Sequence, residues 1–224
     1  MNATLDRSSK LYVALCTIFS VLIVTNNMIY QKFVYLPFFT FHVFELSVGA
    51  ILYPITFLIT DLIAEFYGRY HAKYCIRLAI FMNIFVAVII KSCCYLHATN
   101  WSKIDNDIFE QVFGFYNIAF IGSVLASYVS QIIDVRIYLG LKSLTRGRFL
   151  LMRNNISTAV SLFIDTCIVV GFLATFKILP TSQVFKLIIN SYSFKLLFTL
   201  FSTPIFYLAV VILTKITKIN SLKY

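Results

Sequence analysis

The sequence predicts an all-α integral membrane protein with six transmembrane helices and both termini in the cytoplasm. Of the 224 residues, 60% are hydrophobic and 12% are charged, whereas a soluble domain carries about 25% charged residues. Six apolar segments reach the roughly 20 residues that a bilayer-crossing helix needs. The Lys and Arg residues gather in alternate connections, as the positive-inside rule requires of an even number of spans.

Each expected span ends at a change in composition. The first follows Arg7 and Lys10 and continues past Val24 without a small-residue cleavage site, which favours an uncleaved span over a signal peptide. The second closes at Tyr67, before Gly68, and the fourth and sixth are long enough to tilt or to extend past the bilayer. No linker or repeat divides the chain, which we interpret as one domain over residues 1–224. The spans are expected at about 11–30, 44–67, 74–96, 112–141, 156–176 and 184–213.

The basic residues predict the orientation of the spans. Cytoplasmic connections hold an excess of Lys and Arg. The second and fourth connections and the tail are basic, whereas the third, from Ala98 to Glu110, holds more acidic than basic residues. Both termini are therefore expected in the cytoplasm. The basic residues in question are Arg69, Lys73, Arg77, Lys142, Arg146, Arg148, Arg153, Lys215, Lys218 and Lys223.

The composition and motifs also exclude several function classes. The net charge of +10 comes mostly from residues that flank the spans, so we expect no nucleic-acid partner. The five cysteines form no C-x-x-C pair, and we expect neither a metal site nor a disulfide framework. No G-x-S-x-G, H-E-x-x-H or phosphate-binding glycine loop occurs, so we expect no enzyme and no cofactor.

Ionisable residues inside the spans give the strongest functional signal. A charge at the bilayer centre costs about 2.5–3.5 kcal/mol on insertion scales, so such residues face a bundle interior or a wet cavity. Asp61 and Glu65 are four residues apart and share one helix face. Asp165 lies roughly 14 Å into the fifth span and Lys195 roughly 16 Å into the sixth. These two residues are the natural intramembrane ion pair, which either holds helices together or forms part of a site.

Polar residues continue along one face of each of the last three spans. Their spacings of three and four place each set on one side of its helix. Such stripes predict a bundle with a polar interior, although Ser and Thr stripes are also typical of helix-packing surfaces. The sets are Ser123, Ser127, Gln131 and Asp134; Thr158, Ser161 and Asp165; and Ser191, Lys195, Thr199 and Ser202.

Two of the carboxylates have structural alternatives. Glu65 is compatible with an interfacial pair to Arg69, four residues further along the helix. Asp134 is compatible with a pair to Arg136 or Arg77 that holds two helices together.

Four motifs in this order resemble the queuosine precursor transporter family, also called the vitamin uptake transporter-like or YhhQ-like family. Together with the six spans they cover most of the chain from Tyr53 to Leu213. The chain departs from the family pattern at Leu162, where a polar residue is frequent, and at Ser191, where the family can have an acidic one. The motifs are FLITDLIAEFYGR (57–69), SQIIDVRIYLGLK (130–142), RNNISTAVSLFIDTCIVVGF (153–172) and SYSFKLLF (191–198).

The resemblance implies an importer of a 7-deazaguanine base, which is preQ0, preQ1 or queuine, in the inner membrane of a bacterium. It also implies an architecture like that of energy-coupling-factor substrate-binding subunits. The expected partners are the small 7-deazapurine and the lipid bilayer, and a homo-oligomer is compatible with the sequence.

The residues expected to bind the base follow from its chemistry. A buried carboxylate, Asp165 or Asp61, accepts two adjacent N–H groups of a guanine-like edge, and the other carboxylate balances charge or carries a proton. Amides can read carbonyl and ring nitrogen atoms, and aromatic rings can stack on the heterocycle. The candidates are Tyr53, Phe57, Asp61, Glu65, Gln131, Asp134, Asn155, Asp165, Tyr192 and Lys195.

Two alternatives stay open at the level of the sequence. One is a vitamin-binding membrane subunit that requires a separate ATPase motor, since the chain has no ATPase motif of its own. The other is a non-transporting membrane protein whose polar residues only fix helix packing.

Overall fold

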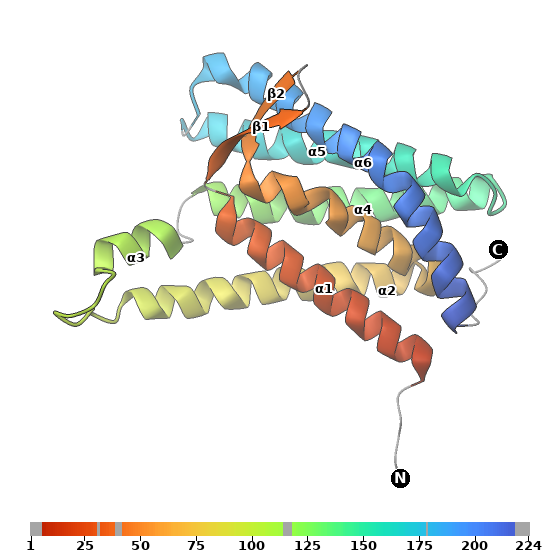
Figure 1. The fold of residues 1–224 in the computed structure, drawn as a ribbon, viewed down its shortest axis with the longest axis horizontal. Helices are drawn as coiled ribbons and strands as arrows, with labels where there is room; N and C mark the ends of the chain where they lie inside the picture. The colour runs from red at the N-terminus through yellow and green to blue at the C-terminus, as the bar shows by residue number, and fades with distance from the viewer. Residues whose placement is uncertain (1–5, 31, 39–41, 114–117, 178, 218–224) are drawn as a thin grey trace, which may run out of the picture.

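The helices of this chain run along one another in a bundle that carries a short hairpin at one end (Figure 1). The computed structural model describes residues 6–30, 32–38, 42–113, 118–177 and 179–217. The elements are α1 (Arg7–Ile29), β1 (Phe33–Phe38), β2 (His42–Ser47), α2 (Val48–Cys94), α3 (Asn106–Phe113), α4 (Ile118–Leu144), α5 (Leu150–Thr175) and α6 (Thr181–Thr217).

Five of the described helices are long and apolar enough to cross a membrane. One of them, α2, has 47 residues, and about 20 suffice for one crossing. The chain is therefore an all-α membrane protein, as the sequence predicts, with α2 spanning the second and third expected segments.

Gly68 divides α2 into two segments. Its backbone has φ 77° and ψ −178°, a conformation that only glycine adopts without strain. The chain reverses there, and the two halves of α2 lie at an angle to each other (Figure 1). The sequence interpretation, which ended the second span at Tyr67, agrees with this break.

The hairpin was not predicted. Residues Phe33 to Phe38 pair antiparallel with His42 to Ser47, so Phe44, the expected start of the second span, lies in a strand, and the helix begins at Val48. Alternate residues of β2 face inward: Phe44 is 4% exposed and Val43 is 53% exposed. This two-residue period is that of a half-buried strand.

The other boundaries differ by a few residues. Residues 106–113 form the separate helix α3, and α4 begins at Ile118 rather than at residue 112. Helix α5 begins at Leu150, six residues before the expected start. Residues 114–117, within the expected fourth span, and the tail residues Lys218 and Lys223 lie outside the described part of the chain.

The basic connections lie at one end of the bundle. The start of α1, the break at Gly68, the α4–α5 connection and the end of α6 share that end, while the hairpin lies at the other (Figure 1). This arrangement agrees with the pattern expected from the positive-inside rule. The sidedness in the cell stays a prediction.

Candidate binding cavity

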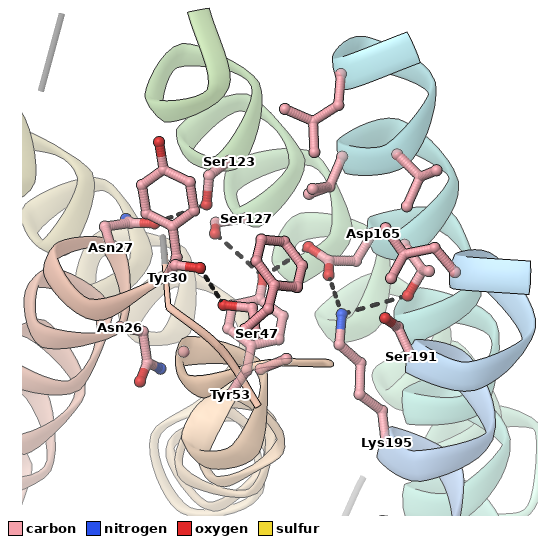
Figure 2. Close-up of a pocket in the computed structure, with 18 of the residues that line it drawn as sticks. Asn26, Asn27, Tyr30, Ser47, Tyr53, Ser123, Ser127, Asp165, Ser191 and Lys195 are labelled. Carbon is pink, nitrogen blue, oxygen red and sulfur yellow. Dashed lines mark hydrogen bonds and ion pairs between the residues drawn. The ribbon is translucent and has the colours of Figure 1, made fainter. Parts of the chain in front are cut away.

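A cavity of about 290 Å³ lies at the hairpin end of the bundle (Figure 2). This volume is at the lower end of the range of roughly 300–1,000 Å³ for small-molecule pockets. Helices α1, α2, α4, α5 and α6 and both strands contribute to the wall. The apolar part of the wall comprises Phe33, Ala50, Val169, Val170, Leu173, Leu179 and Leu187.

An ion pair between α5 and α6 forms the polar part of one wall. Nζ of Lys195 lies 2.8 Å from Oδ2 of Asp165 and 3.2 Å from the hydroxyl of Thr166. Both charged side chains are buried, so each charge depends on the other for compensation. The sequence prediction of an Asp165–Lys195 pair is confirmed.

Tyr53 joins this ion pair from α2. Its hydroxyl donates to Oδ1 of Asp165 at 2.7 Å and lies 3.1 Å from Oγ of Ser127 on α4. Nζ of Lys195 also lies 5.0 Å from the centroid of the Tyr53 ring, within cation–π range. Side chains from α2 and α6 thus hold Asp165 in place.

Asp165 retains hydrogen-bonding capacity toward the cavity. An ionised carboxylate offers about four lone-pair sites. Lys195 occupies a site on Oδ2 and Tyr53 one on Oδ1, and the contact of Ser130 with Oδ1 is long, at 3.4 Å. Each oxygen can therefore accept a further N–H group from a bound molecule.

Two asparagines of α1 line the cavity as well (Figure 2). Oδ1 of Asn27 accepts a hydrogen bond from Ser123 at 2.6 Å. Asn26 is 4% exposed, and neither its Oδ1 nor its Nδ2 atom has a hydrogen-bond partner. A buried amide normally finds partners, so Asn26 is an unsatisfied polar group beside the cavity, with its amide pointing away from Asp165 (Figure 2).

Pro54 modifies the backbone at the start of α2. Proline has no N–H and cannot donate to the carbonyl four residues earlier, which belongs to Ala50 in the cavity wall. The carbonyl oxygen of Ala50 therefore lacks the hydrogen bond that it would accept in a regular helix.

A second polar cluster is buried nearer the basic end of the bundle. Glu65 of α2 lies 3.1 Å from Nζ of Lys142 and 3.5 Å from Nη2 of Arg153. It also accepts a hydrogen bond from Tyr138 at 2.8 Å. The alternative pairing of Glu65 with Arg69 is therefore replaced by a buried network that joins α2, α4 and α5.

The chain matches a family of transport proteins along most of its length. Residues 47–209 fit the model of the family described as "Putative vitamin uptake transporter". The chain belongs to this vitamin uptake transporter family. The matched residues include both members of the ion pair, Asp165 and Lys195, and the second polar cluster. Neither the curated proteins nor the solved structures gave a match.

The transporter brings only some of the expected site residues to the cavity. Tyr53, Asp165 and Lys195 line it, but the other seven candidates do not. Asp61, Glu65, Gln131 and Asp134 are sealed between helices, each with at most 3% exposure. Their roles in binding stay predictions.

The remaining three candidates make contacts of their own. Phe57 is fully buried and packs edge-on against Tyr53, with ring centroids 5.5 Å apart. Oδ1 of Asn155 accepts a hydrogen bond from Thr203 of α6. Tyr192 packs edge-on against Phe163.

Sequence reasoning missed Asn26 and Asn27 as cavity residues. The available signal was a pair of amides that interrupts an apolar span, because polar residues at membrane depth tend to mark a functional site. It also missed Ser47, whose hydroxyl donates to the carbonyl of Tyr30 and joins the hairpin to the end of α1 (Figure 2).

Proposed function

We propose that this vitamin uptake transporter imports a 7-deazaguanine base (preQ0, preQ1 or queuine) across the inner membrane of a bacterium, using the cavity at the hairpin end. The observation that carries the proposal is the Asp165 carboxylate, held by Lys195 and Tyr53 in the wall of one small cavity. The motifs at 57–69, 130–142, 153–172 and 191–198 supply the resemblance to queuosine precursor transporters.

The chemistry of the cavity suits a flat heterocycle with several N–H groups. Asp165 can accept two adjacent N–H groups in charge-assisted hydrogen bonds, which are the stronger kind. The rings of Tyr53 and Phe33 belong to the same wall and offer faces for stacking.

The location of the cavity supports uptake. Its lining includes residues of both hairpin strands, and the hairpin lies at the end of the bundle opposite the basic connections (Figure 1). If those connections are cytoplasmic, as the positive-inside rule predicts, the cavity faces the side from which an imported molecule arrives. The second polar cluster then closes the cytoplasmic side.

The test is the queuosine content of tRNA in a bacterium that lacks both queuosine synthesis and its own importer but keeps the enzymes that use each base. The strain expresses this chain and receives low external preQ0, preQ1 or queuine in separate cultures. Queuosine in the tRNA of one culture supports the proposal and selects the base. No queuosine with any of the three, despite protein in the membrane, contradicts a lone importer.

Variants then test the site at matched expression. Asp165→Asn is expected to weaken uptake by about 10- to 100-fold at low base concentration, since a charge-assisted hydrogen bond contributes roughly 1.5–3 kcal/mol. Asp107→Asn, an exposed carboxylate of α3, is the matched control and should leave uptake unchanged. Copurification of an ATPase that uptake requires would favour the motor-dependent subunit instead.

A further inference from the structure

Two carboxyl groups are neighbours in the sealed part of the bundle, away from the cavity. Asp61 of α2 and Asp134 of α4 are both fully buried, and they lie between the Thr60–Gln131 and Glu65–Tyr138 hydrogen bonds that join these two helices. Asn154 of α5 donates to Oδ2 of Asp61, and Ser157 and Ser161 of the same helix are also fully buried. Neither carboxyl lines the cavity described above.

The oxygen atoms of this pair lack partners. Oδ1 of Asp61 and both carboxylate oxygens of Asp134 have no hydrogen-bond partner. Ionised carboxylates can only accept hydrogen bonds, so two of them cannot bond to each other. A single proton changes this, because the protonated carboxyl becomes a donor to its neighbour and satisfies an oxygen on each side.

The buried charged side chains away from the cavity, here called the sealed cluster, are one positive charge short of neutrality. The described residues include seven buried charged side chains. Asp165 and Lys195 compensate each other. Of the other five, three are acidic and two are basic, which leaves an excess of one negative charge: Asp61, Glu65, Asp134, Lys142 and Arg153. A buried, uncompensated charge is costly, and like charges in contact do not both ionise.

A proton fits this position better than a metal ion. The described residues contain no group of three or more His, Cys, Asp or Glu side chains that could hold a metal. Hard metal cations need a shell of several oxygen ligands, whereas a proton needs neither a shell nor a cavity.

We propose that Asp61 and Asp134 form one proton-binding site that holds a single proton between them, and that this proton exchanges during the transport cycle. The site is therefore the point at which uptake is driven by the proton gradient. The binding of the proton follows from the geometry of the pair, whereas its use in uptake rests on the proposed function.

The charged surroundings of the pair come from three helices. Glu65 of α2, Tyr138 and Lys142 of α4, and Arg153 of α5 are the titratable groups of the sealed cluster. Glu65 forms ion pairs with both cations, and the three groups together carry one positive charge, which balances the Asp pair when that pair holds one proton. Among the described residues, α1 and α6 place no charged side chain in ion-pair or hydrogen-bond contact with Asp61 or Asp134.

A chain of polar groups runs along α2 toward the cavity, from the residue that precedes Asp61 in the sequence. Thr60, adjacent to Asp61, donates to Oε1 of Gln131 at 2.8 Å, and Nε2 of Gln131 donates to Thr56 at 3.0 Å. Thr56 in turn donates to the carbonyl of Tyr53, the residue that bonds Asp165. Helix α2 therefore carries Tyr53 at the cavity, Asp61 of the pair and the hydrogen-bonded residues between them.

Infrared spectroscopy of the purified protein tests proton binding without any substrate. The expected result is a protonated-carboxyl absorption at neutral pH that Asp61→Asn and Asp134→Asn each remove and Asp107→Asn retains. A wild-type spectrum without protonated carboxyl at neutral pH, or a band that both variants keep, would overturn the proposal. Because a variant can fail to fold, the protonated-carboxyl absorption of the wild-type protein is also recorded as a function of pH.

Uptake into proteoliposomes tests the use of the proton. An inward proton gradient should drive accumulation of the base by the wild-type protein, and Asp61→Asn and Asp134→Asn should lose this accumulation while still exchanging internal for external base. Accumulation driven by a sodium gradient alone would overturn the assignment. If the wild-type protein neither binds nor exchanges any of the three bases, the proposed function and the coupling both fail, while the infrared result still decides whether the pair binds a proton.

Discussion

Lys195 of α6 and Asp165 of α5 face each other across 2.8 Å in the wall of the cavity, with the Tyr53 hydroxyl on the other oxygen of the same carboxylate. The ion pair joins the two C-terminal helices and leaves the carboxylate in contact with the cavity. It therefore links the stability of the bundle with the geometry of the candidate site.

Removal of the Lys195 charge is expected to destabilise the protein. Lys195→Met leaves Asp165 buried without its cation, which costs about 3–5 kcal/mol when one partner of a buried pair is removed. The thermal unfolding midpoint in detergent should fall, and the additional substitution Asp165→Asn should restore part of it. Lys186→Met, which removes the exposed pair with Glu45, is the control. An equal loss in both single variants would contradict a special role for the buried pair.

Gly49 permits the close approach of α1 and α2 beside the cavity. A Cβ atom on Gly49 would lie 2.5 Å from the carbonyl oxygen of Asn26, and backbone atoms cannot move away cheaply. Gly49→Ala should therefore cost about 1–3 kcal/mol, as overpacking does, and lower the unfolding midpoint. Gly140→Ala, where a Cβ meets nothing within 4 Å, should be neutral or stabilise by about 0.5–1 kcal/mol. A Gly49→Ala protein as stable as the control would show that α1 adjusts freely.

The break in α2 depends on the positive φ of Gly68. Gly68→Ala forces a side chain into a backbone conformation that is essentially restricted to glycine, at a cost of about 1–3 kcal/mol. We expect less folded protein in the membrane and a lower unfolding midpoint than for Gly171→Ala, whose site is open. Unchanged stability of the Gly68 variant would mean that the two segments of α2 join in another way.

The sidedness of the bundle can be measured by labelling engineered cysteines with a membrane-impermeant thiol reagent. Ser102 lies in the connection between α2 and α3, and Arg148 in the connection between α4 and α5; both are exposed. In a background without Cys93 and Cys94, Ser102→Cys should react in intact cells from which any outer membrane has been removed. Arg148→Cys should react only in inverted vesicles. The reverse pattern would invert the orientation and place the cavity on the cytoplasmic side.

The sequence alone was sufficient for features that depend on composition and on the cost of isolated charges. Apolar segments of span length predict membrane helices, and Gly68 marks the end of one. The Asp165–Lys195 pair was predictable because each charge lies deep in an apolar helix and requires a partner. The hairpin was missed because the apolar–polar alternation of β2 is short and runs directly into the apolar segment that begins at Val48.

Only the tertiary structure separated the two polar regions of the protein. The spacing of Asp61 and Asp165 tells which face of its own helix each residue occupies, but not which neighbouring helix meets that face. Packing sealed Asp61 and Asp134 between the helices and left Asp165 at the cavity. Packing also brought Asn26, more than 130 residues away in the sequence, to the same cavity. Helix periodicity determines in which direction a side chain points around the axis of its own helix. The residues that this side chain contacts depend on how all the helices of the bundle are arranged.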